Sequence, residues 1–394
     1  MTSDMMGSRR ARWIAGAAAL AGMTLVPAWG QALAPSQGAA GQAGHGGWNQ
    51  GDGPFRRVAS FPVFLNTSED LETVAEIVAA ADEGRLLVYT DSETDNVGFV
   101  DISDPSSPQA AGVVDVGGEP TSVAVRDGYA LVCVNTSPDF VNTSGDLPVI
   151  DIASRTIVRT IPLGGQPDAI AVSPNGRFAA IAIENERDED LGNGEPPQAP
   201  PGFVVIVDTV GPPAAWGTRQ VDLVGIPDLY PDDPEPEYVD ISALNIAAVT
   251  CQENNHIVLI RLVDGRVVAD FPAGTADLDE IDTLENDLIE QTASLTAVPR
   301  EPDAVAWTSP ITFATADEGD LFGGSRGFTT FLPFGNTLYE AGNTLEHLAA
   351  RAGHYPEERS GNKGNEPEGV EFAQYGMSRY LFVGSERAGF VAVY

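Results

Sequence analysis

Acidic residues recur beside a repeated proline in this chain. Five segments, which begin EPTS, QPDA, EPEY, EPDA and EPEG, place a proline between positions that are mostly glutamate or aspartate. The acids flanking these prolines are Glu119, Asp168, Glu235, Glu237, Glu301, Asp303, Glu366 and Glu368. Proline restricts the backbone between two acids, and Ca²⁺ takes oxygen ligands, many of them from carboxylates. We therefore predict that these residues are metal ligands and that the cation is Ca²⁺.

A second set of acids lies further along the same segments, after each pair of β-rich runs. It comprises Glu184, Glu186, Glu253, Asp317, Glu318, Asp320 and Glu386. The overall acid content of 57 in 394 residues would place about five acids at the positions where these two sets hold fifteen. If the fold gathers them, they repel one another unless a cation supplies counter-charge. The alternative is that they cap loops and keep an acidic surface soluble.

Four arginines and one histidine accompany the acids and are candidates for ligand binding. They are Arg187, Arg300, Arg326, Arg387 and His256. Each arginine could pair with a neighbouring acid. Together with a metal, the arginines could instead hold a phosphate oxygen bidentately, which predicts a small phosphorylated ligand. His256 begins a third β-rich run and could titrate near neutral pH.

Motifs for covalent or nucleotide chemistry are absent from the sequence. No Gly-x-Ser-x-Gly elbow, phosphate loop, dinucleotide fingerprint or EF-hand loop is present, and no two histidines have zinc spacing. The leading hypothesis is therefore a binding or surface module with a Ca²⁺ site. The alternative is a Ca²⁺-dependent phosphoesterase that uses metal and arginine. A third hypothesis is a scaffold whose insertion loops contact protein partners.

The charge balance limits the possible partners. The net charge is −36, and Lys363 is the only lysine. Such a charge excludes nucleic acid and anionic membrane surfaces as expected partners. It leaves divalent cations, basic ligands or simple solubility.

The amino terminus has the pattern of a signal peptide over residues 1–34. Three arginines precede an alanine-rich apolar stretch that is too short for a stable transmembrane helix, and small residues follow it. Residues 35–60 are rich in glycine and glutamine, which predicts a flexible linker. We expect an exported protein, periplasmic, secreted or on the cell surface, without a transmembrane segment in the mature chain.

The proline-initiated segments are internal repeats. Their prolines lie at Pro120, Pro167, Pro236, Pro302 and Pro367, and each starts a strand-turn-strand pattern that often continues into further strands. A degenerate earlier copy over residues 74–103 makes six. Four strands per unit in series predict an all-β propeller over residues 61–394. Antiparallel pairing would then place both sets of acids at one mouth of the central channel.

Three further details follow from the propeller prediction. The insertions over residues 275–299 and 343–358 are expected to form short helices. Cys133 and Cys251 lie in apolar runs two blades apart, so we expect buried free thiols. The sixth repeat ends after its third strand, so the sequence predicts an incomplete last blade.

Three segments resemble a known family: EPEYVDISALNIAAVTCQENNHIVLIRL, REPDAVAWTSPITFATADEGDLFGGSRGFTTF and EPEGVEFAQYGMSRYLFVGSERAGFVAVY. They are similar to the choice-of-anchor I family, and the resemblance covers about residues 70–394. It implies a secreted bacterial β-propeller, and because members of the family usually continue into another blade at the point where this sequence ends, it also implies a parent of seven blades. Some members of the family carry a loose alkaline-phosphatase or surface-glycoprotein label, but the resemblance supplies no nucleophile for this sequence.

Overall fold

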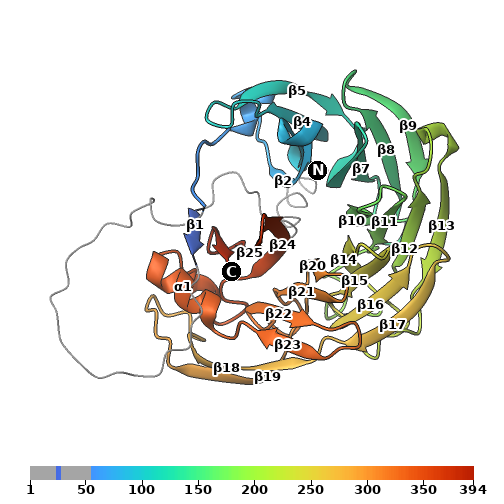
Figure 1. Ribbon diagram of the computed structural model, residues 1–394. Helices are drawn as coiled ribbons and strands as arrows, with labels where there is room; N and C mark the ends of the chain where they lie inside the picture. The colour runs from blue at the N-terminus through green and yellow to red at the C-terminus, as the bar shows by residue number, and fades with distance from the viewer. Residues whose placement is uncertain (1–23, 28–54) are drawn as a thin grey trace, which may run out of the picture.

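Six β-sheets surround a central channel, as the repeats predict (Figure 1). The computed structural model describes residues 24–27 and 55–394. The predicted β-propeller is therefore confirmed. Most of the predicted signal peptide and linker lie outside the described residues, so those assignments stay predictions.

Five blades take all four strands from consecutive segments, and the sixth takes three. Blade one contains β2 (Ala75–Ala81), β3 (Leu86–Asp91), β4 (Asn96–Asp101) and β5 (Gln109–Asp115). Blade two contains β6 (Glu119–Arg126), β7 (Tyr129–Asn135), β8 (Gly145–Asp151) and β9 (Thr156–Pro162). Blade three contains β10 (Pro167–Val172), β11 (Phe178–Ile183), β12 (Phe203–Asp208) and β13 (Gly217–Asp222). Blade four contains β14 (Pro236–Ile241), β15 (Ile246–Cys251), β16 (His256–Arg261) and β17 (Arg266–Pro272). Blade five contains β20 (Val305–Ser309), β21 (Thr312–Asp317), β22 (Gly327–Phe331) and β23 (Thr337–Glu340). Blade six contains β24 (Pro367–Tyr375), β25 (Ser378–Ser385) and β26 (Phe390–Val393).

Blade six obtains a fourth strand from the amino-terminal part of the chain. Strand β1 (Thr24–Pro27) pairs in parallel with β26, with Thr24 opposite Phe390. The sequence predicted only three strands here, because a distant segment that joins a sheet leaves no sign in the repeat pattern. Since β1 lies inside the predicted signal peptide, removal of residues 1–34 would leave this blade with three strands.

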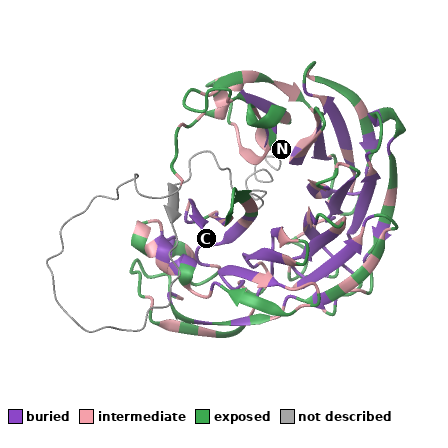
Figure 2. Cartoon of the chain, viewed as in Figure 1, coloured by how far each residue is buried: buried purple, intermediate pink, exposed green. Residues whose placement is uncertain are grey.

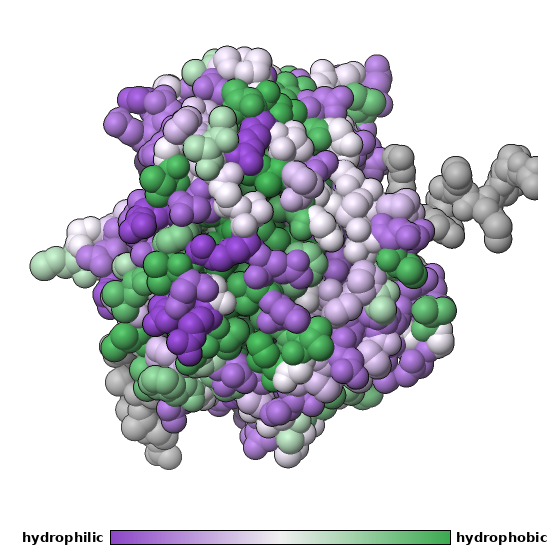
Figure 3. Space-filling model, turned by 90° about the vertical axis from the view of Figure 1, so that its right-hand side faces the viewer, coloured by the Kyte–Doolittle hydropathy of each residue, from purple (hydrophilic) through white to green (hydrophobic). Residues whose placement is uncertain are grey.

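The burial of a strand depends on its position within the blade (Figure 2). All six residues of β11 are buried, because this strand is paired on both edges and covered on both faces. Outer strands such as β9 are mostly exposed. On the rim that Figure 3 shows, hydrophobic and hydrophilic residues are mixed. Hydrophilic residues therefore do not cover that side uniformly.

The insertion between blades four and five is a β-hairpin, so the predicted helix over residues 275–299 is wrong. Strands β18 (Thr275–Ile281) and β19 (Ala293–Pro299) pair antiparallel with two register shifts. In β18, Ala276 and Leu278 are buried while their neighbours are exposed, which is the alternation of a strand. The shift near Ile281 brings that residue inward as well and creates a spacing of three that imitates a helix.

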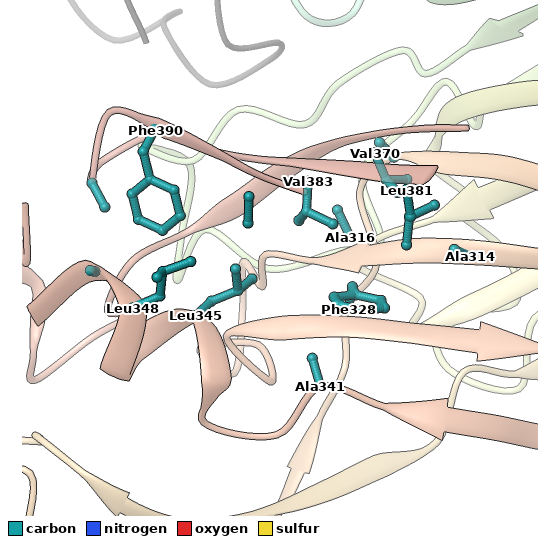
Figure 4. Close-up of a cluster of buried hydrophobic side chains, with 14 of the residues drawn as sticks. Ala314, Ala316, Phe328, Ala341, Leu345, Leu348, Val370, Leu381, Val383 and Phe390 are labelled. Atoms are coloured by element: carbon teal, nitrogen blue, oxygen red, sulfur yellow. The ribbon is translucent and has the colours of Figure 1, made fainter. Parts of the chain in front are cut away.

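The second predicted helix is confirmed as α1 (Thr344–Ala352), the one α-helix of the described residues. Its buried Leu345 and Leu348 pack into a cluster that includes Phe328 of blade five and Phe390 of blade six (Figure 4). The helix thus covers the junction of these two blades. Short 3₁₀ turns occur at Val63–Asn66, Asp82–Gly84, Ser92–Thr94, Pro213–Ala215 and Glu357–Arg359.

Both cysteines are free and buried, as predicted. Cys133 lies on β7 and Cys251 on β15, which are two blades apart.

Candidate metal centre in the propeller channel

In five of the six blades, a break in strand pairing leaves one residue unpaired at the start of the innermost strand. In blades one, two, three, four and six, the pairing of the first two strands shifts register directly after the position of the repeated proline. Such a bulge leaves a residue unpaired and re-aims its side chain. Blade five has the corresponding residue just before β20. The resulting channel ring consists of Glu76, Thr121, Asp168, Glu237, Asp303 and Glu368.

Glu76 is a member of this ring that the sequence analysis missed. The segment VAEIVAAADEGR of blade one aligns with QPDAIAVSPNGR of blade three without a gap, so that Glu76 matches Asp168. The proline is replaced by Ala75, which hid the match. Burial raises the pKa of Glu76 to about 7, although Ser92 Oγ donates a hydrogen bond of 3.0 Å to it.

Five carboxylates from blades three and four form the largest group of closely spaced carboxylates among the described residues, which we call the mouth cluster. In one subset, the oxygens of Asp168, Glu184 and Glu237 lie within 4.8 Å of one another, and in a second the same holds for Glu184, Glu235 and Glu253. Two oxygens bound to one Ca²⁺ at about 2.4 Å can be no more than about 4.8 Å apart. Both subsets therefore meet the geometric requirement for sharing an ion, and Glu184 belongs to both.

The mouth cluster resists ionisation. Burial, followed by the charge of nearby carboxylates, raises the pKa of Glu184, Glu235 and Glu237 well above the usual value. Burial also raises the pKa of Asp168 and Glu253 to about 7. The cause is physical: the charged form has lost water and faces other negative charges. A bound cation would remove this penalty.

Arg187 is the internal counter-charge of the cluster. Its Nη1 donates to Glu235 at 3.1 Å and to Glu253 at 2.9 Å, and its Nη2 pairs with Asp320 of blade five. These contacts tie three blades together. One guanidinium still leaves the five carboxylates with an excess of negative charge when they are ionised.

Three members of the mouth cluster have carboxylate oxygens without a partner among the described residues. Glu184 is only 8% exposed and has neither a hydrogen bond nor an ion pair of its carboxylate within residues 55–394. Glu235 Oε1 and Glu253 Oε2 are also buried without a hydrogen-bond partner in the described structure. Buried polar atoms normally have partners, so this group has the capacity to accept a ligand.

A second acidic group, Glu318, Glu366 and Glu386, also has oxygens within 4.8 Å of one another. It is already compensated by basic side chains. Lys363 donates to Glu318 at 3.2 Å, and Arg387 donates to Glu366 at the same distance. Arg359 also bonds to Glu366. This group therefore needs a metal less than the mouth cluster does.

Two of the predicted ligands have other roles in the structure. Glu301 accepts backbone N–H groups of Asp320 at 2.8 Å and of Phe322 at 2.9 Å, so its carboxylate supports the loop after β21. Glu119 begins β6 opposite Asn135, and its charge raises the pKa of Glu76. Neither residue joins the mouth cluster.

The predicted ligand-binding residues do not form one site. Arg326 is buried and donates to the carbonyls of Asp282, Ser360 and Asn362. Arg300 donates to the Ala273 carbonyl at 2.8 Å.

The other two members lie in different blades. His256 Nε2 lies 3.3 Å from Asp270 Oδ2, and burial lowers the pKa of the imidazole. Arg387 pairs with Glu386 at 3.1 Å in blade six. The predicted role of this set in phosphate binding stays a prediction.

Two solved structures illustrate the similarity to other proteins. The Cps50 (Swd1) β-propeller domain of Myceliophteria thermophila is 11% identical, with 82% of this chain and 97% of that chain covered and a TM-score of 0.41. A chain of a Nidogen/Laminin complex is 13% identical, with a TM-score of 0.35; the match covers 52% of this chain and 66% of that chain. No curated protein matches the chain.

A protein-family profile gives the more specific result. The profile described as the choice-of-anchor I domain matches residues 76–226 and 321–394, which is more than half of the chain. That description names a class of domain and no catalytic activity. No helix in residues 24–27 and 55–394 has both the length and the apolar character needed to cross a bilayer.

Proposed function

The chain belongs to the choice-of-anchor I domain family, and from this premise we propose that it is an exported binding module whose channel mouth holds Ca²⁺. The family and the fold together support a surface-associated propeller module. The Ca²⁺ site and export are the finer parts of the proposal.

The observation that carries the metal proposal is Glu184. Its carboxylate is nearly buried, has no partner within the described residues and belongs to both subsets of the mouth cluster. Burying an ionised carboxylate without counter-charge is strongly unfavourable. A cation bound beside Glu184 would compensate several of the surrounding carboxylates at once.

The donor atoms favour Ca²⁺ over other common metals. The mouth cluster offers carboxylate oxygens only, whereas Zn²⁺ sites in proteins usually include cysteine or histidine. Mg²⁺ requires strict octahedral geometry and retains several waters. Ca²⁺ accepts more oxygens in a looser arrangement, which suits five carboxylates from two blades.

The phosphoesterase alternative gains no support from the site. It requires arginines that can turn toward a phosphate beside the metal. Arg187 is held by the mouth cluster itself, and Arg326 by three backbone carbonyls.

Calorimetric titration of Ca²⁺ into chelator-treated protein tests the metal proposal. We expect saturable binding of one ion per chain, and binding at least tenfold weaker in Glu184→Gln, which corresponds to about 1.4 kcal/mol. The control Asp279→Asn removes an exposed acid of β18 and should bind as the unaltered protein does. The proposal is refuted if the unaltered protein does not bind Ca²⁺ or if Glu184→Gln binds it equally well.

Export is tested separately by fractionating cells that produce the full chain. Protein found outside the cytoplasm with a shortened amino terminus would support it. Full-length protein confined to the cytoplasm would contradict it.

A further inference from the structure

The channel also contains a cavity of about 190 Å³. Every blade contributes to its lining, through its innermost strand or the residues just before that strand. One lining residue from each blade, in the order of the blades, is Glu76, Thr121, Asp168, Tyr238, Asp303 and Glu368. Only Asp168 is shared with the mouth cluster. The cavity is therefore adjacent to the proposed Ca²⁺ site but is built largely from different residues.

The charged part of the lining is acidic. Four ring carboxylates and Glu371 line the cavity, and no arginine or lysine occurs among the described residues that do so. Asp303 is 5% exposed, and its carboxylate has no hydrogen bond or ion pair in the described part of the chain. A buried carboxylate in this situation favours an incoming positive charge.

The remaining lining is apolar and aromatic. Val78 comes from blade one, Tyr238 from blade four, and Val370, Phe382 and Val391 from blade six. Such walls cannot replace the hydration shell of a metal ion, but they favour a hydrocarbon group. Aromatic rings near the carboxylates also attract organic cations through their faces.

The volume limits the size of the ligand. A cavity of about 150 Å³ is known to accommodate benzene, so a cavity of this volume has room for a ring with a short substituent. The lining thus combines space for a compact hydrocarbon body with several carboxylates, and no lysine or arginine of the described residues lines it. Lys363, whose charge reaches Asp303, donates to Glu318 at 3.2 Å.

From this combination we propose that the cavity binds a small organic ammonium ion: a primary amine whose hydrocarbon body is about the size of a benzene ring. The ammonium group is held by Asp303 with Glu76, Asp168 and Glu368 around it, while the hydrocarbon lies against Val370 and Phe382. This site goes beyond the Ca²⁺ module and does not depend on it, because the two share only Asp168 and Asp303 lies outside the mouth cluster.

Benzylamine, which is protonated at pH 7, is a suitable probe. It is titrated calorimetrically into chelator-treated, desalted protein in amine-free phosphate buffer, with benzyl alcohol as the neutral probe of similar shape. We expect saturable binding of one benzylammonium per chain and at least tenfold weaker binding of benzyl alcohol. Absence of saturable binding, or equal affinity for the two probes, overturns the proposal.

Variants identify the site and separate the two proposals. Asp303→Asn should weaken benzylamine binding at least tenfold, while the exposed control Asp279→Asn should not change it. Glu76→Gln is the second variant, used if circular dichroism shows that Asp303→Asn does not fold, and it should also weaken binding. Glu184→Gln should bind Ca²⁺ at least tenfold more weakly and retain benzylamine binding. Undiminished benzylamine affinity in the folded cavity variant contradicts the proposal, whatever the result with Ca²⁺.

Discussion

The metal-free protein should lose stability as the pH rises from 5 to 7. Burial raises the pKa of Asp168 and Glu253 to about 7 and that of Glu186 to about 8. In the unfolded chain these groups titrate near pH 4. Between these values the folded state retains protons that the unfolded state releases, so increasing pH favours unfolding.

The magnitude follows from proton counting. At pH 6, a carboxyl with a pKa of about 7 is roughly nine-tenths protonated when folded and nearly fully ionised when unfolded. Each bound proton contributes a slope of about 1.4 kcal/mol per pH unit. His256 acts in the opposite direction, because burial lowers its pKa, but it subtracts at most one proton. The three acids alone therefore leave a net excess of about two protons and a slope of about 3 kcal/mol per pH unit. Burial also raises the pKa of Glu76, Glu301 and Glu371 to about 7, so these groups add to the excess and both figures are lower limits.

Potentiometric titration of native and urea-unfolded protein between pH 5 and 8 measures this excess directly. It requires no assumption of two-state unfolding, which a chain of this length need not satisfy. The surface acids Asp101 and Asp264 have lowered pKa values and so titrate below this range. The reasoning is refuted if the two curves coincide at pH 6 or if the native protein binds fewer protons.

Two substitutions test the contacts between the blades. Arg187→Met removes the counter-charge of two buried glutamates and should destabilise the protein by about 3–5 kcal/mol, seen as a lower melting temperature; the surface variant Arg85→Met should melt almost as the unaltered protein does. Leu345→Ala should cost about 2–5 kcal/mol by leaving a cavity under α1. Leu338→Ala, at an exposed position of β23, is its control, and equal melting temperatures of these two variants would contradict the assigned packing.

The fold could be predicted because the repeated proline marks the bulge at the start of the innermost strand. Pro167, Pro236 and Pro367 each stand where the first strand bulges, and the alternation that follows fixes which residues face the core. Blade one was recognisable from the same alternation, although Ala75 replaces the proline. The pairing of β1 with β26 was not predictable, because it joins segments more than 300 residues apart.

The site was predicted in composition but not in detail. Glu235 and Glu301 occupy the same position of the repeat, yet Glu235 belongs to the mouth cluster and Glu301 supports a loop. The difference arises from the loop after β21, which brings the backbone N–H groups of Asp320 and Phe322 to Glu301. Repeat position therefore locates a carboxylate near the channel, while the loops decide whether it is available to a ligand.

The buried cysteines have a practical consequence for labelling. Cys133 and Cys251 are inaccessible, and burial raises the pKa of both thiols, which keeps them protonated. Electrophilic reagents that are attacked by thiolates therefore react poorly with the native protein. A cysteine introduced at an exposed site such as Asp279 can be labelled with a fluorophore without first removing the native pair. The propeller thereby provides a scaffold for spectroscopic measurements in which the native cysteines stay unlabelled.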